Sequence, residues 1–258
     1  MIGLVYDIHM RERALSLLSQ GRSLNSVSGE LDVSRSALRS WQARPAPLRP
    51  EIFCSRCQSG TEPPPAAYAY LLGLYLGDGC LSASPRGVYL LRIACADAWP
   101  GLIAACAEAV RAVRPGNRVG LVRRQGCQYV TSYSKHWPCL FPQHGPGRKH
   151  DRRIVLEPWQ QEIVDAWRWE FVRGLVHSDG CRNMNWTTRV VGGEVKRYTY
   201  PRYFFTNVSD DIRRLYTDTL DALGVEWRTC VRGGRPYSVS VARRASVALM
   251  DAHVGPKH

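Results

Sequence analysis

A repeat within the chain constrains the fold more than any other feature of the sequence. Two segments that each end in Asp-Gly-Cys, residues 69–80 and 171–181, lie roughly 100 residues apart. Apolar residues dominate each segment, and the same coarse order of elements follows each one. We therefore expect a main body of two similar halves, each built from one copy of the repeat.

Each copy predicts the order helix, strand, strand, helix, strand, strand, helix (αββαββα). Gly and Pro mark the turns of the first hairpins, at 85–87 and 192–193, and Gly126 and Gly233 mark those of the second hairpins. The fold class is therefore α+β, with two four-stranded antiparallel sheets. The predicted elements after the motif helices are Leu81–Ser84, Val88–Cys95, Ala98–Val113, the hairpin Arg118–Ser134 and Trp137–Phe141, and then Asn183–Val191, Lys196–Asn207, Asp211–Leu223, the hairpin Val225–Val241 and Arg244–Ala252.

Both motif helices carry a glycine in the middle, at Gly73 and Gly174. Glycine inside a helix lowers the stability of the helix by about 1 kcal/mol relative to alanine, so its presence indicates a place where a side chain would not fit. We expect it to permit the close approach of two backbones. The two motif helices are therefore predicted to pack against each other at the interface between the copies.

An aspartate ends each motif helix. Asp78 and Asp179 come immediately before Gly79 and Gly180, which we expect to be left-handed helix caps. A carboxylate there faces the negative end of the helix dipole, and two such carboxylates close together resist double ionisation. A divalent cation between them removes the conflict and suits phosphodiester hydrolysis, which needs an activated water and a stabilised leaving oxygen. The alternative is that both are polar helix ends without a chemical role.

At these residues the chain resembles the LAGLIDADG homing endonuclease family. The segment Leu71–Gly79 matches the nine-residue motif at its Leu, Gly, Leu and terminal Asp-Gly positions, and Val172–Gly180 matches it more loosely. Position six of the motif is Leu76 in one copy and His177 in the other, where the family often has an acid. The resemblance covers about three quarters of the chain. It implies a monomer with an internal pseudo-twofold axis, whose two sheets form a saddle in the DNA major groove.

The resemblance also implies the metal ligands. Asp78 and Asp179 would bind Mg²⁺ or Mn²⁺, assisted by the backbone carbonyl groups of Gly77 and Ser178. The expected activity is divalent-metal-dependent, site-specific hydrolysis of double-stranded DNA. Some relatives keep the fold as non-cleaving transcription regulators and others are RNA maturases, so both functions are alternatives. The two intact acids favour the nuclease.

A basic residue follows the last helix of a half in this family, near the cleaved phosphate. Lys149 matches that place in the first copy and Lys257 is its repeat mate, with Arg148 as the nearest competitor. We therefore predict Lys149 and Lys257 to be catalytic together with the two aspartates.

The charge of the chain points to a polyanionic partner. Lysine and arginine outnumber acidic residues, which gives a formal net charge of +13, and this bias favours nucleic acid over a membrane. No apolar run approaches the length of a membrane-spanning helix, so we expect a cytoplasmic, nucleoid-associated protein.

Residues alternate between the faces of a strand, so counting in steps of two from each aspartate predicts part of the DNA-reading surface. The predicted DNA contacts of the main body are Ser82, Ser84, Arg86, Arg123, Arg124 and Gln128 in the first copy, and Asn183, Asn185, Thr187, Arg228, Arg232 and Arg235 in the second.

Three short helices are predicted near the N-terminus, over Arg11–Gln20, Ser23–Leu31 and Ser34–Trp41. Their spacing resembles a helix-turn-helix of the homeodomain-like or resolvase type. The resemblance implies a buried side with Val33, Leu38 and Trp41. The residues facing the major groove would be Arg35, Ser36, Arg39 and Ser40. A three-helix bundle for protein contacts is the alternative.

The predicted domains are 1–44 for the helix-turn-helix, 45–65 for a Pro-rich linker, 66–155 for the first half and 156–258 for the second. Cys54 and Cys57 in the linker have the spacing of half a zinc site. A structural Zn²⁺ would need further ligands from afar, such as Cys139, His144 or His150, and free thiols in a linker are an equal alternative. The nine cysteines are odd in number and scattered, which argues for reduced thiols rather than a disulfide framework.

Overall fold

Residues 8–43 and 63–258 are described by the computed structural model of the chain, and they fall into two units that are treated separately below. The smaller unit consists of three helices: α1 (Ile8–Ser19), α2 (Leu24–Leu31) and α3 (Arg35–Ala43). Ser23 and Ser34 are the predicted N-caps, since their hydroxyl groups accept hydrogen bonds from the backbone N–H groups of Ser26 (3.2 Å) and Ala37 (3.3 Å). The first helix begins at Ile8 rather than at Arg11.

A small core holds the three helices of this unit together. Its buried members are Ala14, Val27, Val33 and Leu38, and Trp41 packs against them half-buried. Asp32 ends α2 in the left-handed conformation with φ of 50°, which makes the predicted turn between α2 and α3. The predicted buried side of the three-helix region is therefore confirmed.

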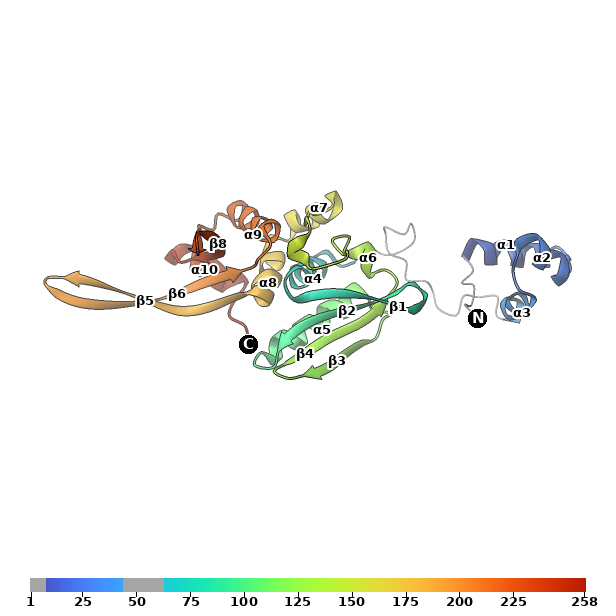
Figure 1. Cartoon of the computed structure of the whole chain (residues 1–258), viewed down its shortest axis with the longest axis horizontal. Coiled ribbons are helices and arrows are strands. Elements are labelled where there is room, and N and C mark those ends of the chain that lie inside the picture. Colours follow the sequence, from blue (N-terminus) through green and yellow to red (C-terminus); the bar gives the residue numbers. More distant parts are fainter. Residues whose placement is uncertain (1–7, 44–62) are drawn as a thin grey trace. The chain divides into compact units, whose positions relative to one another are not determined.

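The larger unit contains the predicted αββαββα order twice. The first half consists of α4 (Pro65–Asp78), β1 (Gly79–Ser84), a 3₁₀ turn (Pro85–Gly87), β2 (Val88–Ala96), α5 (Pro100–Val113), β3 (Val119–Arg124), β4 (Cys127–Ser134) and α6 (Trp137–Leu140). The second half consists of α8 (Arg168–Asp179), β5 (Gly180–Val191), β6 (Glu194–Thr206), α9 (Asp210–Ala222), β7 (Arg228–Arg232), β8 (Arg235–Val241) and α10 (Arg244–His253). Between the halves lie a second 3₁₀ turn (Lys149–Asp151) and α7 (Pro158–Ala166). Figure 1 shows this arrangement.

The two sheets have the same topology. Each is a four-stranded antiparallel sheet, in the order β1-β2-β4-β3 in the first half and β5-β6-β8-β7 in the second. One continuous core lies beneath both sheets and includes the apolar residues of α4 and α8. The predicted fold class and the internal repeat are therefore confirmed in three dimensions.

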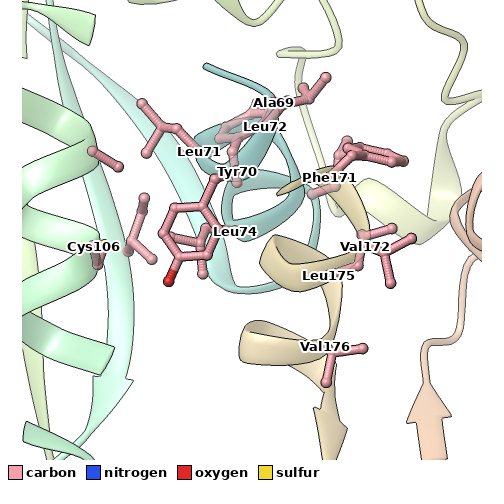
Figure 2. Close-up of a cluster of buried hydrophobic side chains, with 14 of the residues drawn as sticks. Ala69, Tyr70, Leu71, Leu72, Leu74, Cys106, Phe171, Val172, Leu175 and Val176 are labelled. Carbon is pink, nitrogen blue, oxygen red and sulfur yellow. The ribbon is translucent and has the colours of Figure 1, made fainter. Parts of the chain in front are cut away.

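Helices α4 and α8 pack directly on each other at the junction of the halves (Figure 2). A β-carbon on Gly73 would lie 2.6 Å from the carbonyl oxygen of Phe171, and one on Gly174 would collide with the carbonyl oxygen of Tyr70. Real β-carbons do not approach backbone oxygens so closely, so only glycine allows this separation. The predicted reason for the two mid-helix glycines is confirmed.

Gly79 and Gly180 differ from the prediction. They are extended, with φ of −85° and −106°, rather than left-handed. Glycine is required there by space: a β-carbon would lie 2.6 Å from the α-carbon of Tyr75 or 2.8 Å from that of Val176. The chain therefore passes from helix into strand with no left-handed residue between them, which brings each aspartate to the start of a sheet.

Side chains of each sheet alternate between a face packed beneath helices and an opposite face, which we call the open face. In the first half Leu91, Ile93 and Val130 are fully buried on the packed face, while Cys80 and Tyr133 are exposed on the open face. The open face of the first half contains Cys80, Ser82, Ser84, Leu90, Arg92, Val122, Arg124, Thr131 and Tyr133. That of the second half contains Cys181, Asn183, Asn185, Tyr200, Arg202, Phe204, Arg228 and Ser240.

The hairpin β5–β6 extends beyond its own sheet (Figure 1). All of β5 pairs with β6, but β8 pairs only with Tyr203–Thr206 of β6. The outer part of the hairpin is therefore a two-stranded ribbon, and it accounts for the extra residues of the second copy. Within residues 8–43 and 63–258, the structure contains no helix that is both long and apolar enough to span a membrane.

Candidate active site

Two carboxylates, one from each half, meet where α4 and α8 end. The tight packing of the two helices brings their last turns together, so Asp78 and Asp179 lie on either side of the junction. A β-carbon on Gly77 would lie only 3.0 Å from Oδ2 of Asp179, which shows how closely the second aspartate approaches the first motif. Asp78 is exposed to solvent and Asp179 is half-buried, so both are accessible to a ligand.

The carboxylates disfavour each other's ionisation. Partial burial, followed by the negative charge of Asp179, raises the pKa of Asp78 to about 6. Partial burial also raises the pKa of Asp179, and there a hydrogen bond of 2.6 Å from Nδ2 of Asn207 opposes the effect. The site thus holds negative charge at an energetic cost, which a bound cation would offset.

Lys149 and Lys257 lie beside the two carboxylates, as predicted from the repeat. Nζ of Lys149 donates hydrogen bonds to the carbonyl oxygens of Tyr75 (2.5 Å) and Gly77 (2.7 Å), and Nζ of Lys257 donates one to that of Ser178 (2.8 Å). Burial lowers the pKa of Lys149 to about 8 and also lowers that of Lys257, while both aspartates oppose the change. The carbonyls of Gly77 and Ser178, which we predicted to be metal ligands, are therefore bonded to lysine in this structure.

The segment after each lysine crosses to the other half. The backbone N–H of Ile154 donates to the carboxylate of Asp211 in the first turn of α9, at 2.8 Å. The backbone oxygen of His258 accepts from the N–H of Leu102 in the first turn of α5, at 3.1 Å. Each lysine is consequently held between an anchor in its own half and an anchor in the other.

The surroundings of the two aspartates are not identical, which the sequence did not reveal. The pairing of Gly79 with Ile93 and of Gly180 with Phe205 makes Cys95 the counterpart of Asn207. In the first half the buried thiols of Cys95 and Cys106 interact with each other, and both lie near Asp78. Only the register of the strands connects these residues to the site, and the sequence carries no local signal for it.

His177, at position six of the second motif, has a structural contact. Its Nδ1 lies 2.9 Å from the hydroxyl oxygen of Tyr70, across the junction between the halves. Burial lowers the pKa of His177 to about 4, so the ring is neutral at physiological pH. The guanidinium of Arg173 lies over the ring of Tyr70, 4.4 Å from its centroid. The histidine thus joins α4 to α8.

The donor set at the junction fits a hard divalent cation. Two carboxylates and nearby backbone carbonyls are the oxygen ligands that Mg²⁺ and Mn²⁺ take, and such ions are commonly held by one or two carboxylates together with substrate phosphate oxygens. Among residues 8–43 and 63–258, no group of three or more His, Cys, Asp or Glu side chains converges on one point. The remaining ligands would thus come from water and substrate. The predicted zinc residues Cys54 and Cys57 lie outside the described residues.

The open faces carry most of the predicted DNA contacts. Ser82, Ser84 and Arg124 lie on the open face of the first sheet, and Asn183, Asn185, Thr187 and Arg228 on that of the second. Arg86 is exposed but lies in the turn after β1, with φ of 64°, so strand alternation does not apply to it. Arg232 and Arg235 pair at the end of the β7–β8 hairpin, and their side chains lie outside the described part of the structure.

Two of the predicted DNA contacts lie on the packed face of the first sheet instead of the open face. Gln128 pairs with Cys95 and with Arg123, and this row lies on the packed face, on the same side as Ile93. The expectation that Arg123 and Gln128 share the DNA-reading surface is therefore corrected by the register. Conversely, Arg92 and Arg202 lie on the open faces, and the prediction missed them because their strands were not counted from an aspartate.

In the smaller unit Arg35, Ser36, Arg39 and Ser40 are all exposed on α3. Nη1 of Arg35 donates to Oδ1 of Asn25 on α2, at 3.1 Å. The helix therefore presents one polar, basic surface, as the helix-turn-helix prediction requires.

Comparisons with known proteins agree on the fold. No protein-family model matches the sequence, and no curated protein matches it either. Among solved structures, the chain is similar to I-DmoI in complex with DNA and Mn, with 16% identity, a TM-score of 0.50, and coverage of 75% of this chain and 98% of that one. A variant of I-DmoI in complex with its target DNA in the presence of Mg gives 15% identity, a TM-score of 0.51, and coverage of 75% and 98%. The N-terminal LAGLIDADG domain of DUF199/WhiA gives 10% identity, a TM-score of 0.46, and coverage of 74% and 83%.

The larger unit therefore has the two-half LAGLIDADG fold of the homing endonucleases. The similarity covers nearly the whole of I-DmoI and three quarters of this chain. It confirms the resemblance that the two Asp-Gly motifs indicated, and with it the predicted α+β architecture.

Proposed function

We propose that this protein is a site-specific endonuclease that hydrolyses double-stranded DNA with a divalent metal held by Asp78 and Asp179. The observation that carries the proposal is the junction itself. It places one accessible carboxylate from each half beside the other, and the pKa of Asp78 is raised to about 6. Because both halves belong to one chain, a monomer supplies the complete site.

The metal is Mg²⁺ or Mn²⁺. Asp78 and Asp179 would hold it, with the carbonyl oxygens of Gly77 and Ser178 as adjacent donors. When bound, the cation supplies Lewis-acid chemistry to the phosphodiester, through an activated water and a stabilised leaving oxygen. The DNA, Mn and Mg complexes of I-DmoI, which has the same fold, support this choice.

Lys149 and Lys257 have an electrostatic role in this proposal. Each ammonium is directed by backbone carbonyls to the edge of the carboxylate pair. Fixed positive charge at this place stabilises the extra negative charge that a phosphodiester develops during hydrolysis. The segment that follows each lysine is anchored in the other half, which keeps the ammonium near the carboxylate pair.

The open faces would read the DNA. They flank the carboxylates in both halves, and side chains that can hydrogen-bond to base edges or phosphates occupy them. The net charge of +13 supplies the long-range attraction. The proposed contacts are Ser82, Ser84, Arg86, Arg92, Arg124, Asn183, Asn185, Thr187, Arg202 and Arg228, together with Arg232 and Arg235 from the second hairpin.

The smaller unit is proposed to be a second DNA-binding element. Its exposed residues Arg35, Ser36 and Arg39 on α3 correspond to a recognition helix. A protein that acts in this way would be found with the nucleoid in the cytoplasm. The zinc site at Cys54 and Cys57 stays a prediction, which the metal content of the purified protein tests.

The experiment is a selection followed by a cleavage assay. Randomised duplexes are first selected for binding in Ca²⁺, which favours binding without turnover, and the enriched duplex is then incubated with Mg²⁺ or with EDTA. We expect convergence on one long site, cleavage of both strands in Mg²⁺ only, and an affinity that falls steeply with salt. Selection without cleavage would instead identify a DNA-binding regulator. Preference for a structured RNA over every duplex would identify a maturase.

A further inference from the structure

Two arginines on the open faces are held by neighbouring side chains, at different places in the two halves. Arg92 pairs across the strands with Cys80, the second residue after Asp78. Arg202 pairs with Asn183, the fourth residue after Asp179. Arg202 therefore lies one residue pair farther from its aspartate along the open face than Arg92 lies from its own.

Arg92 is fixed against its own sheet. Its Nη2 donates a hydrogen bond of 2.9 Å to Oγ of Ser82, and the side chain is half-buried. The counterpart of Arg92 in the second half is Phe204, because Phe204 pairs with Cys181 as Arg92 pairs with Cys80. The place nearest the carboxylates is thus basic in one half and aromatic in the other.

Arg202 is held by contacts with neighbouring strands. Its Nε donates a hydrogen bond of 2.5 Å to Oγ of Ser240, and its guanidinium lies 4.8 Å from the centroid of the Phe204 ring. It lines a pocket of about 260 Å³ together with Trp227, Arg228 and Arg243. The counterpart of Arg202 in the first half is Leu90, which pairs with Ser82. The next place outward is therefore basic only in the second half.

A restrained guanidinium on a DNA-reading surface is suited to guanine. Arginine binds O6 and N7 of guanine in the major groove with two parallel hydrogen bonds, and this is the commonest base-specific contact. Its planar fork loses little freedom when neighbours already hold it, as Ser82 holds Arg92 and Ser240 holds Arg202. Leucine and phenylalanine at the counterpart places donate no such hydrogen bonds and favour the methyl group of thymine.

We infer that Arg92 and Arg202 are specificity-determining residues, each of which selects a guanine, and that the two guanines lie at unequal distances from the centre of the target. The guanine for Arg92 lies nearer the centre in one half-site, and the guanine for Arg202 lies farther out in the other. The inference rests on the proposed function, since it assumes that the open faces bind DNA. It adds that the different places of the two arginines in the two halves make the target sequence asymmetric.

The test is a binding selection from randomised duplexes in Ca²⁺ with the full chain and three variants. Arg92→Gln and Arg202→Gln remove the guanine contacts, and Arg111→Gln is the matched control because Arg111 is exposed on α5, which packs against the other face of the first sheet. Thermal melting checks that each variant folds like the parent. We expect each test variant to lose about ten-fold of the preference for guanine at one position, with the other positions unchanged. Arg111→Gln should reproduce the parental site.

Two results would overturn the inference while leaving the function intact. In one, the variants bind more weakly but keep every base preference, which would make the arginines phosphate contacts. In the other, the two lost guanines lie at equal distances from the centre. A parent that enriches no duplex would contradict the proposed function itself, and the inference would fail with it.

Discussion

Nζ of Lys149 lies 2.7 Å from the carbonyl oxygen of Gly77, the residue just before Asp78. A positive charge of the protein thus occupies the neighbourhood in which the proposed metal would bind. Lys257 has the same relationship to Ser178, at 2.8 Å. In the metal-free protein the two lysines act as internal counter-ions for the carboxylate pair. A metal that binds there competes with them for the carbonyl oxygens of Gly77 and Ser178.

Replacing Lys149 by methionine removes this competition. In Lys149→Met we expect Ca²⁺ to bind about ten-fold more tightly without DNA, because one repelling unit charge close to the cation is lost. The metal-free variant should melt at a lower temperature, since the carboxylates lose a counter-ion. Isothermal titration calorimetry and thermal melting at pH 7, where Lys149 is protonated and Asp78 is ionised, measure the two effects. Arg148→Met is the control, because Arg148 is the exposed neighbour and should change neither. Weaker Ca²⁺ binding in Lys149→Met would refute the competition.

Asp78→Asn should stabilise the metal-free protein at neutral pH. The folded-state pKa of Asp78, about 6, lies above its ordinary value of 3.8. The ionised carboxylate therefore lowers stability above pH 6, and this cost disappears below about pH 4. We expect the variant to melt roughly 2–4 °C higher in EDTA at pH 7, after discounting the effect for solvent exposure, and to match the parent at pH 4. Glu108→Gln, an exposed acid on α5, should show no such pH-dependent difference. A variant less stable than the parent at pH 7 would be evidence against the strained pair.

The affinity for the cation should depend on pH near 6. A protonated carboxyl group is a poor ligand, and Asp78 is half protonated at a pH of about 6. We expect Ca²⁺ affinity measured by calorimetry to be nearly constant above pH 7 and to fall by about ten-fold between pH 7 and pH 5. If the affinity stays level down to pH 5, the carboxylate that binds the cation is not Asp78.

Gly174→Ala should separate α4 from α8. Its new β-carbon would collide with the carbonyl oxygen of Tyr70 and lie 3.0 Å from the α-carbon of Gly73, and neither backbone atom can move alone. We expect a loss of about 3 kcal/mol, or a melting temperature roughly 10 °C lower. Gly29→Ala is the comparison: this helical glycine of the smaller unit has no atom within 4 Å of the added β-carbon, so the larger unit should melt as in the parent. An unchanged melting temperature for Gly174→Ala would show that the helices do not pack this closely.

The local signals in the sequence predicted the parts of the fold that repeat. Hydrophobic periodicity, turn residues and the two Asp-Gly motifs were enough for the αββαββα order, the paired helices and the two carboxylates. The residues counted in steps of two along the first strand of each half do share one face, because the count starts at an aspartate whose position the helix fixes.

Features that depend on long-range pairing were not predictable in the same way. The pairing of β4 with β2 decides on which face of the sheet Arg123 and Gln128 lie. A one-residue difference in register moves every side chain of a strand to the other face. Arg92, Arg202 and Asn207 were missed for the same reason. Gly79 is extended, whereas the sequence alone suggests a left-handed cap. Glycine is needed there because a β-carbon would lie 2.6 Å from the α-carbon of Tyr75, a contact that the sequence does not reveal.

The most direct test of the central claim is strand-specific cleavage of the selected duplex by the parent, Asp78→Asn and Asp179→Asn in Mg²⁺. Each strand carries its own label, and binding is measured in parallel in Ca²⁺. If the two carboxylates hold the metal, the parent cuts both strands, while both variants bind the duplex and lose at least about 100-fold of the cleavage rate. Cleavage at the parental rate by either variant would contradict the proposal that Asp78 and Asp179 form the catalytic centre.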